Sequence, residues 1–135
     1  MPDSKLVKIL MIEDDATHRQ MYGMQFKQSG FTHFETVSSG QEGLNAIEKE
    51  HPDLVLLDIG LEDIDGIEVL KRLKADSATA DIPVIVLSNM REKDKGEQAQ
   101  QLGAVDYILK AKYLPREIVE RVERFFDQPD KVGHS

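Results

Sequence analysis

The stretch DLVLLDIGLEDIDG, residues 53–66, starts with an apolar run that ends directly in a carboxylate. Residues 54–57 lack the alternation of polar and apolar side chains that marks a strand with one solvent face, so they predict a strand buried on both faces. Asp58 follows with no turn residue in between. A bare acid at the exit of a buried strand needs a physical reason, which the exits of the other apolar runs provide.

Three more runs are short, apolar and contain β-branched residues: 9–12, 84–87 and 107–109. A fifth run, residues 31–37, mixes polar and apolar side chains, which is typical of an edge strand. Helical patterns separate these runs. The patterns cover residues 16–28, a segment opened by the capping pair Ser39 and Glu42, a segment with Ile67, Leu70 and Leu73 at helical spacing, residues 91–102, and a segment that begins at Pro115.

Two of these helices have weak patterns. Residues 16–28 scatter their apolar side chains around the whole circumference, and residues 91–102 are charged, interrupted by Gly96, and poor in apolar anchors. Both are predicted as helices because parallel strands need crossover connections. Residues 91–102 are expected to form the least stable element.

Five strand-then-helix units predict one α/β domain with an open, doubly wound parallel sheet. This domain is expected to cover residues 5–127, with flexible termini at residues 1–4 and 128–135. The sequence contains neither an internal repeat nor an interior linker that would divide it.

The composition excludes several classes of function. A formal net charge of −8 argues against a nucleic-acid partner, because such binding depends on Lys and Arg that neutralise phosphates. The absence of cysteine excludes disulfides, thiolate metal sites and thiol nucleophiles. No apolar stretch approaches the ~20 residues that span a bilayer, and the first residues lack the features of a secretory signal. A cytoplasmic location without membrane insertion is expected.

Ligands of open α/β sheets bind beyond the carboxyl ends of the strands, so the residues at the strand exits carry the functional information. The exits deliver Glu13, Asp14 and Asp15 from the first strand, Asp58 from the third, Ser88 from the fourth and Lys110 from the fifth. Carboxylates gathered on one edge repel each other unless a counter-charge is present. A divalent cation supplies that charge, and a few oxygen ligands with room for water suit Mg²⁺ better than Ca²⁺.

A bound Mg²⁺ can hold the oxygens of a phosphoryl group and neutralise charge during its transfer. Asp58 is then a candidate covalent nucleophile, since carboxylates are known to accept phosphoryl groups. Lys110 would contribute a second positive charge, and Ser88 a hydrogen-bond donor. The strand exits therefore predict phosphoryl transfer onto Asp58.

These residues resemble the receiver domain of two-component response regulators, a family with a flavodoxin-like fold. The resemblance spans roughly residues 5–127 and rests on four segments that occur in order: ILMIEDD, LVLLDIGL, VIVLSNM and DYILK. It implies a three-layer sandwich with five helices around a five-stranded parallel sheet of order 2-1-3-4-5. It also implies Mg²⁺ as the cofactor.

The resemblance assigns a role to each exit residue. Asp58 takes the phosphoacceptor position, and Ser88 and Lys110 match the hydroxyl and the lysine of the phosphoryl site. Ser88 and Tyr107 match the switch residues, in which movement of the hydroxyl group changes the rotamer of the aromatic side chain. The implied metal ligands are Asp14, Asp58, the backbone carbonyl of Gly60 and, through water, Glu13.

Some positions depart from the family pattern. Ala111 follows Lys110 where the family has a proline in a cis peptide, and a non-proline cis bond costs ~2.5–4 kcal/mol, so a trans bond is predicted. Glu62 replaces a common proline, a change that the turn is expected to tolerate. Asn89 is larger than the usual residue and is expected to narrow access to the phosphoryl site.

Gly60 and Met90 occupy two positions that tune the lifetime of the phosphoryl group in the family. Neither residue has a polar side chain that could orient a hydrolytic water. Comparatively slow self-dephosphorylation is therefore expected.

The expected function is that of a phosphoacceptor response regulator and not of an enzyme in the usual sense. The phosphoryl group would come from a phosphohistidine of a sensor histidine kinase or of a histidine phosphotransfer protein. An unknown protein target would read the face of the fourth helix, fifth strand and fifth helix. No output domain follows the last helix, so a stand-alone regulator or relay intermediate is expected, and a segment of a longer protein stays open.

Three other functions have to be weighed. A receiver that has lost phosphorylation could act as a docking module, although the acids and the lysine are all present. An aspartate-dependent phosphatase would need a second Asp two residues after Asp58, where Gly60 stands. A mononucleotide-binding domain would need a glycine-rich turn after the first strand, whereas the sequence EDDATH offers acids that repel phosphate.

Overall fold

The computed structural model describes residues 4–89 and 93–127. The strands of its sheet are β1 Lys8–Ile12, β2 His33–Val37, β3 Leu54–Asp58, β4 Val84–Ser88 and β5 Asp106–Leu109. The α-helices are α1 Ala16–Gln28, α2 Gly40–Glu50, α3 Gly66–Ala75, α4 Lys93–Gln101 and α5 Pro115–Asp127. Two short 3₁₀ helices, η1 Ser4–Leu6 and η3 Lys110–Lys112, precede β1 and follow β5.

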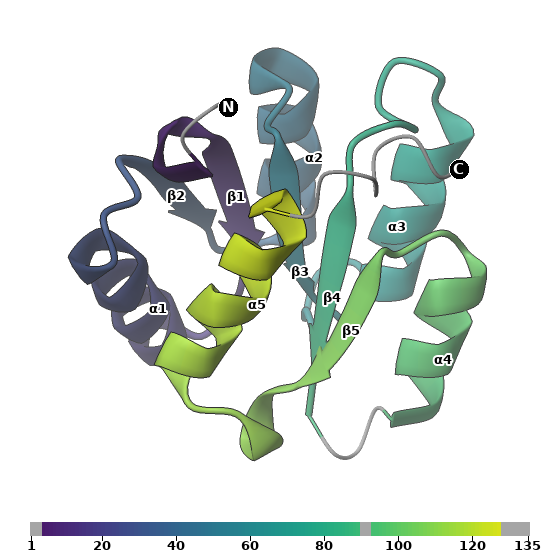
Figure 1. The fold of residues 1–135 in the computed structure, drawn as a ribbon. Helices are drawn as coiled ribbons and strands as arrows, with labels where there is room; N and C mark the ends of the chain where they lie inside the picture. The colour runs from purple at the N-terminus through teal and green to yellow at the C-terminus, as the bar shows by residue number, and fades with distance from the viewer. Residues whose placement is uncertain (1–3, 90–92, 128–135) are drawn as a thin grey trace.

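The sheet has the order β2-β1-β3-β4-β5 and all its neighbours are parallel, which confirms the predicted doubly wound topology. Figure 1 shows α1 and α5 on one face of the sheet and α2, α3 and α4 on the other. Because every strand runs in the same direction, the carboxyl ends of all strands share one edge. The chain turns outward from β1 to β2 and then returns to β3 on the other side of β1. This reversal makes the edge beside β1 and β3 the expected ligand site.

Strand β3 is buried along its whole length because helices cover both faces of the sheet. Val55 and Leu57 belong to the apolar cluster on one face, and Leu54 and Leu56 to the cluster on the other. Each residue of the run therefore faces one of two cores. This arrangement explains why residues 54–57 show no alternation of polar and apolar side chains.

Helix α1 buries only part of its apolar surface. Tyr22 and Phe26 are buried, and Phe26 stacks on Phe34 of β2 with ring centroids 4.3 Å apart. Met21 and Met24 remain 38% and 57% exposed. Two aromatic residues one turn apart are thus enough to anchor the helix, and the prediction of a helix over residues 16–28 is confirmed.

Helix α4 packs on the sheet through small residues. Ala99 is fully buried, and the ring of Tyr107 from β5 occupies the place that a Cβ on Gly96 would take. Gly96, which interrupts the helical pattern of the sequence, therefore makes room for an aromatic ring. The described part of this helix is Lys93–Gln101, within the predicted range of residues 91–102. Its low stability remains a prediction.

Some of the predicted features lie outside the described residues. The predicted flexible termini lie outside the described residues apart from Ser4, and so does Met90.

The Lys110–Ala111 bond is trans, as predicted, and these residues form η3. Within residues 4–89 and 93–127, every helix is too short or too polar to span a lipid bilayer.

Gly66 begins α3, and a Cβ at this position would lie 2.5 Å from the Ile59 Cα and 2.8 Å from the Asp58 carbonyl oxygen. Because both obstacles are backbone atoms, Gly66→Ala is expected to lower the free energy of unfolding by about 1–3 kcal/mol. Gly23→Ala is the matched control, since nothing lies within 4 Å of its Cβ position. Alanine there should stabilise α1 by up to about 1 kcal/mol. Urea denaturation measures both changes, and equal stability of the two variants would contradict the close packing of Gly66.

Candidate functional site

Three acidic side chains and one lysine converge at the carboxyl edge of the sheet. Glu13 and Asp14 follow β1, Asp58 ends β3, and Lys110 follows β5. One carboxylate oxygen from each acid lies within 4.8 Å of those of the other two. The strand order explains this meeting, because it sets β1 beside β3 and places β5 on the same edge, although Glu13 and Lys110 are 97 positions apart in the sequence.

Lys110 neutralises part of this negative charge. Its Nζ donates hydrogen bonds to Glu13 Oε1 at 3.0 Å and to Asp58 Oδ2 at 3.1 Å. Its side chain is only 13% exposed, and burial by itself would lower the pKa of an ammonium group. Attraction to Asp58 and Glu13 outweighs burial, so the pKa of Lys110 lies above its ordinary value and the side chain stays charged.

Glu13 is the most deeply buried acid of the site, with 1% of its surface exposed. Its Oε2 accepts the N–H of Asp15 at 3.2 Å, and Arg19 donates to its backbone carbonyl at 2.9 Å. Burial and, after it, repulsion from Asp58 raise the pKa of Glu13 to about 7, against the opposing effect of Lys110. With a pKa near 7, this carboxyl is partly protonated near neutral pH.

Asp58 is held in one orientation by backbone and side-chain donors. Its Oδ1 accepts the N–H of Gly60 at 3.0 Å, while Oδ2 accepts from Lys110. The next residue, Ile59, donates its N–H to the carbonyl of Leu87 in β4 at 3.0 Å, so strand pairing continues past the acid. The carboxylate is therefore orientated before any ligand arrives.

His18, which no sequence motif singled out, also reaches this cluster. Its Nδ1 lies 3.5 Å from Lys110 Nζ and 3.7 Å from Glu13 Oε1. The side chain of Asp15 caps α1 by accepting the His18 N–H at 3.0 Å, and this cap fixes the first helical turn. The sequence signal that could have identified His18 is its place in the first turn after the strand-end acids.

Ser88 ends β4 between the two strands that carry the phosphoacceptor candidate and the lysine. In the sheet register its neighbour Leu87 pairs with Asp58, and Ser88 itself pairs with Leu109. Its Oγ is fully buried and has no hydrogen-bond partner within residues 4–89 and 93–127. Leaving a buried hydroxyl unpaired costs about 1–3 kcal/mol, so a ligand oxygen that accepts this hydrogen bond would be favoured.

Tyr107 lies on β5, with its ring against the backbone of α4 at Gly96. The ring therefore connects β5, the strand that precedes Lys110, with α4, the helix that follows Ser88 and β4. The side chain of Asn89 is exposed. Its narrowing of access to the phosphoryl site remains a prediction.

The donor set fits a hard divalent cation. Glu13, Asp14 and Asp58 offer oxygen ligands only, and three carboxylates outnumber the single charge of Lys110. Mg²⁺ prefers a few carboxylates, with water completing its coordination. These three residues could hold the ion, while the participation of the Gly60 carbonyl remains a prediction.

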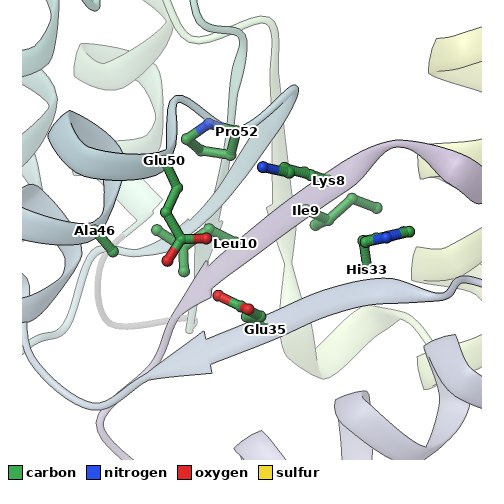
Figure 2. A pocket seen from close by; sticks show the side chains of 8 residues that line it. All are labelled: Lys8, Ile9, Leu10, His33, Glu35, Ala46, Glu50 and Pro52. Carbon is green, nitrogen blue, oxygen red and sulfur yellow. The ribbon is translucent and has the colours of Figure 1, made fainter.

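A separate small cavity lies at the opposite ends of the strands, between β1, β2 and α2 (Figure 2). Lys8 and His33, which begin β1 and β2, line it together with Glu35 and Glu50. Its volume of about 40 Å³ is far below the roughly 300 Å³ at which small-molecule sites begin. This cavity has no part in the carboxylate site.

Residues 9–123 match the response regulator receiver domain family. The chain belongs to this family. The receiver is 37% identical over 115 residues to the phosphate regulon transcriptional regulatory protein PhoB of Pseudomonas aeruginosa, a match that covers 85% of this chain and 49% of PhoB. PhoB of Escherichia coli is 36% identical over 116 residues, which cover 86% of this chain and 50% of that protein. The chain thus spans about half the length of the curated relatives it matches.

Solved structures of receivers have the same fold. A CheY-like receiver domain protein from Methanospirillum hungatei superposes with a TM-score of 0.82 at 26% identity, covering 93% of this chain and 98% of that one. The Mn²⁺-bound form of the response regulator Rcp1 gives a TM-score of 0.78 at 26% identity, covering 91% of this chain and 96% of that one. The predicted flavodoxin-like, three-layer architecture is therefore confirmed.

The burial of Glu13 makes the stability of the metal-free receiver depend on pH. Its folded pKa of about 7 lies above the ordinary 4.5, so the folded state binds this proton more tightly than the unfolded state does. The free energy of unfolding is therefore expected to fall as pH rises from 4.5 towards 7. Urea denaturation in the presence of a chelator measures this slope. Glu13→Gln should flatten it, and an unchanged slope in that variant would assign the dependence to another group.

Proposed function

We propose that this receiver accepts a phosphoryl group on Asp58 from a phosphohistidine of a sensor histidine kinase or a histidine phosphotransfer protein. The observation that carries the proposal is the position of Lys110, which bridges Glu13 and Asp58 at the carboxyl edge where Asp14 also lies. A structural ion pair needs one acid for one ammonium group, whereas this edge gathers three carboxylates and pairs only two of them with the lysine.

In the transfer, a carboxylate oxygen of Asp58 attacks the phosphorus atom while the bond between phosphorus and the imidazole nitrogen breaks. The product is an acyl phosphate on Asp58. The leaving nitrogen keeps the electron pair of the broken bond, and the imidazole ring ends neutral when its other nitrogen carries the proton. Because Gly60 and Lys110 already hold the two carboxylate oxygens, Asp58 needs little reorientation before attack.

Lys110 and Ser88 support the proposed product state. Before transfer, the Lys110 ammonium pairs with Asp58, the residue that would receive the phosphoryl group. After a short movement the same ammonium can pair with a phosphoryl oxygen. The Ser88 hydroxyl would gain the acceptor that it lacks among the described residues. Asp14, Asp58 and the Gly60 carbonyl, with Glu13 through water, would hold Mg²⁺, and the ion would supply further positive charge for the phosphoryl oxygens. The Mn²⁺-bound form of Rcp1 supports a divalent ion in this family.

The proposed output face consists of α4, β5 and α5. A hydrogen bond from Ser88 to a phosphoryl oxygen would change the packing next to β5, where the Tyr107 ring lies against Gly96 of α4. Such a change biases a helix that has few buried anchors between two arrangements. An unknown protein target would read that difference, without contact to nucleic acid or insertion into a membrane. We assign no enzymatic activity beyond the receiver's own phosphorylation and its slow loss of the phosphoryl group.

Incubation of the receiver with acetyl phosphate and Mg²⁺ is expected to add one phosphoryl group to Asp58. Asp58→Asn should not be labelled, because its amide cannot form an acyl phosphate, and a chelator should suppress labelling of the wild type. Mass spectrometry of the intact protein measures the product. Absence of label in the wild type, or equal labelling of Asp58→Asn, would contradict the proposal and favour a docking module that works without phosphorylation.

The phosphorylated receiver is expected to lose its phosphoryl group slowly, because position 60 is a glycine and position 90 a methionine. Gly60→Asn and Met90→Glu each add a polar side chain that can orient an attacking water, so both should shorten the lifetime of the label. The decay is followed after removal of the phosphodonor, with the exposed neighbour Glu62→Gln as a control. A large slowing of decay in the Gly60→Asn variant is the contrary result.

A further inference from the structure

We propose that Asp63 is a positioning residue that ties the phosphoacceptor loop, residues 59–65, to the N-terminus of α2. The inference rests on the proposed function, since this loop leads directly from Asp58 and contains Gly60. No sequence motif singled out Asp63. Its role follows from contacts between two segments that are more than twenty positions apart.

The carboxylate of Asp63 accepts two hydrogen bonds from the start of α2. Its Oδ1 accepts the N–H of Gly40 at 2.8 Å, and its Oδ2 the N–H of Gln41 at 3.0 Å. The N–H of the following residue, Glu42, donates to Ser39 Oγ at 3.1 Å. The first N–H groups of a helix have no partner within the helix, and the helix dipole favours a negative charge there. These bonds, with that of Gly40 first, lower the pKa of Asp63 and keep it ionised.

The base of the phosphoacceptor loop is closed by other contacts. Ile59 donates its N–H to the carbonyl of Leu87, and Gly66 donates its N–H back to the carbonyl of Ile59, both at 3.0 Å. Gly60 donates to the phosphoacceptor carboxylate, and the side chain of Leu61 is buried in the core. These contacts hold the base on the sheet, and Asp63 adds a restraint by attaching the far part of the loop to a different element.

Asp65 provides a second, weaker attachment on the other side. Its Oδ1 accepts the N–H of Ile67 at 2.8 Å and caps α3, while its Oδ2 accepts from Lys95 of α4 at 3.1 Å. The side chains of Lys95 and Asp65 are 44% and 47% exposed, and exposed pairs of this kind contribute little to stability. Asp63, with two backbone donors, is the stronger link between the phosphoacceptor loop and a neighbouring helix.

The end of α2 also packs closely on this loop. A Cβ at Gly40 would lie 3.1 Å from both Ile64 Cβ and Val69 Cγ2, so the glycine lets the helix end approach. Position 62, directly before Asp63, is a glutamate and not a proline, so no ring restricts backbone rotation there, and the hydrogen bonds of Asp63 restrain this part of the loop.

The test compares Asp63→Ala with Ser39→Ala in the otherwise intact receiver. Both substitutions remove hydrogen bonds from the same helix end, but only Asp63 connects that end to the phosphoacceptor loop. Amide hydrogen exchange of Gly60 and Gly66 in metal-free protein is the first readout. Exchange should be at least about tenfold faster in Asp63→Ala, because both charge-assisted hydrogen bonds of Asp63 are lost, and little changed in Ser39→Ala.

The second readout is the Mg²⁺ concentration that gives half-maximal phosphorylation by acetyl phosphate. It should rise severalfold in Asp63→Ala, while the rate at saturating Mg²⁺ changes less, because a displaced loop weakens ion binding before it weakens attack. Asp63→Asn retains one acceptor oxygen and should lie between the two, and it replaces Asp63→Ala if that variant does not fold. Equal exchange and equal Mg²⁺ dependence in the Asp63 and Ser39 variants would overturn the inference. A wild type that accepts no label would instead refute the proposed function, and the exchange rates would still decide whether Asp63 holds the loop.

Discussion

The ammonium group of Lys110 lies between two buried carboxylates, 3.0 Å from Glu13 Oε1 and 3.1 Å from Asp58 Oδ2, and the receiver is organised around this contact. Two acids at that depth repel each other and lose hydration, so their charged forms need a stabilising cation beside them. Parallel strands meet this need because they deliver side chains from distant parts of the sequence to one edge. The apolar strands behind the edge lower the local polarity, which strengthens both the attraction to Lys110 and the repulsion between the acids.

The site combines an acid that is held in place with a hydroxyl and an aromatic ring that the proposed signalling would move. Asp58 is held by Gly60 and Lys110 at the end of a fully buried strand, which suits a group that must be orientated for reaction. Ser88, by contrast, has no hydrogen-bond partner among the described residues. The ring of Tyr107 packs on Gly96 of α4, a helix with few buried side chains. Chemistry benefits from fixed acids, whereas signalling needs an element close to balance between two arrangements.

Two positions at which this sequence differs from the expected receiver pattern have well-defined local contacts. Ala111 follows Lys110 through a trans bond, and the chain forms the short helix η3 while Lys110 still reaches both acids. Glu62 removes a proline from the phosphoacceptor loop, and the following Asp63 binds two N–H groups of α2. In both places local backbone contacts hold the segment that carries Lys110 or follows Asp58.

The sequence by itself determined the alternation of strands and helices, the doubly wound sheet, and the gathering of Glu13, Asp14, Asp58 and Lys110 at one edge. These features follow from local burial patterns and from the rule that parallel strands end together. Only the tertiary structure decided that Gly96 accommodates the Tyr107 ring, that His18 reaches Lys110, and that Asp63 caps a distant helix. Each of these contacts joins side chains or helix ends from separate segments, and their meeting depends on packing angles and loop paths that no local pattern encodes.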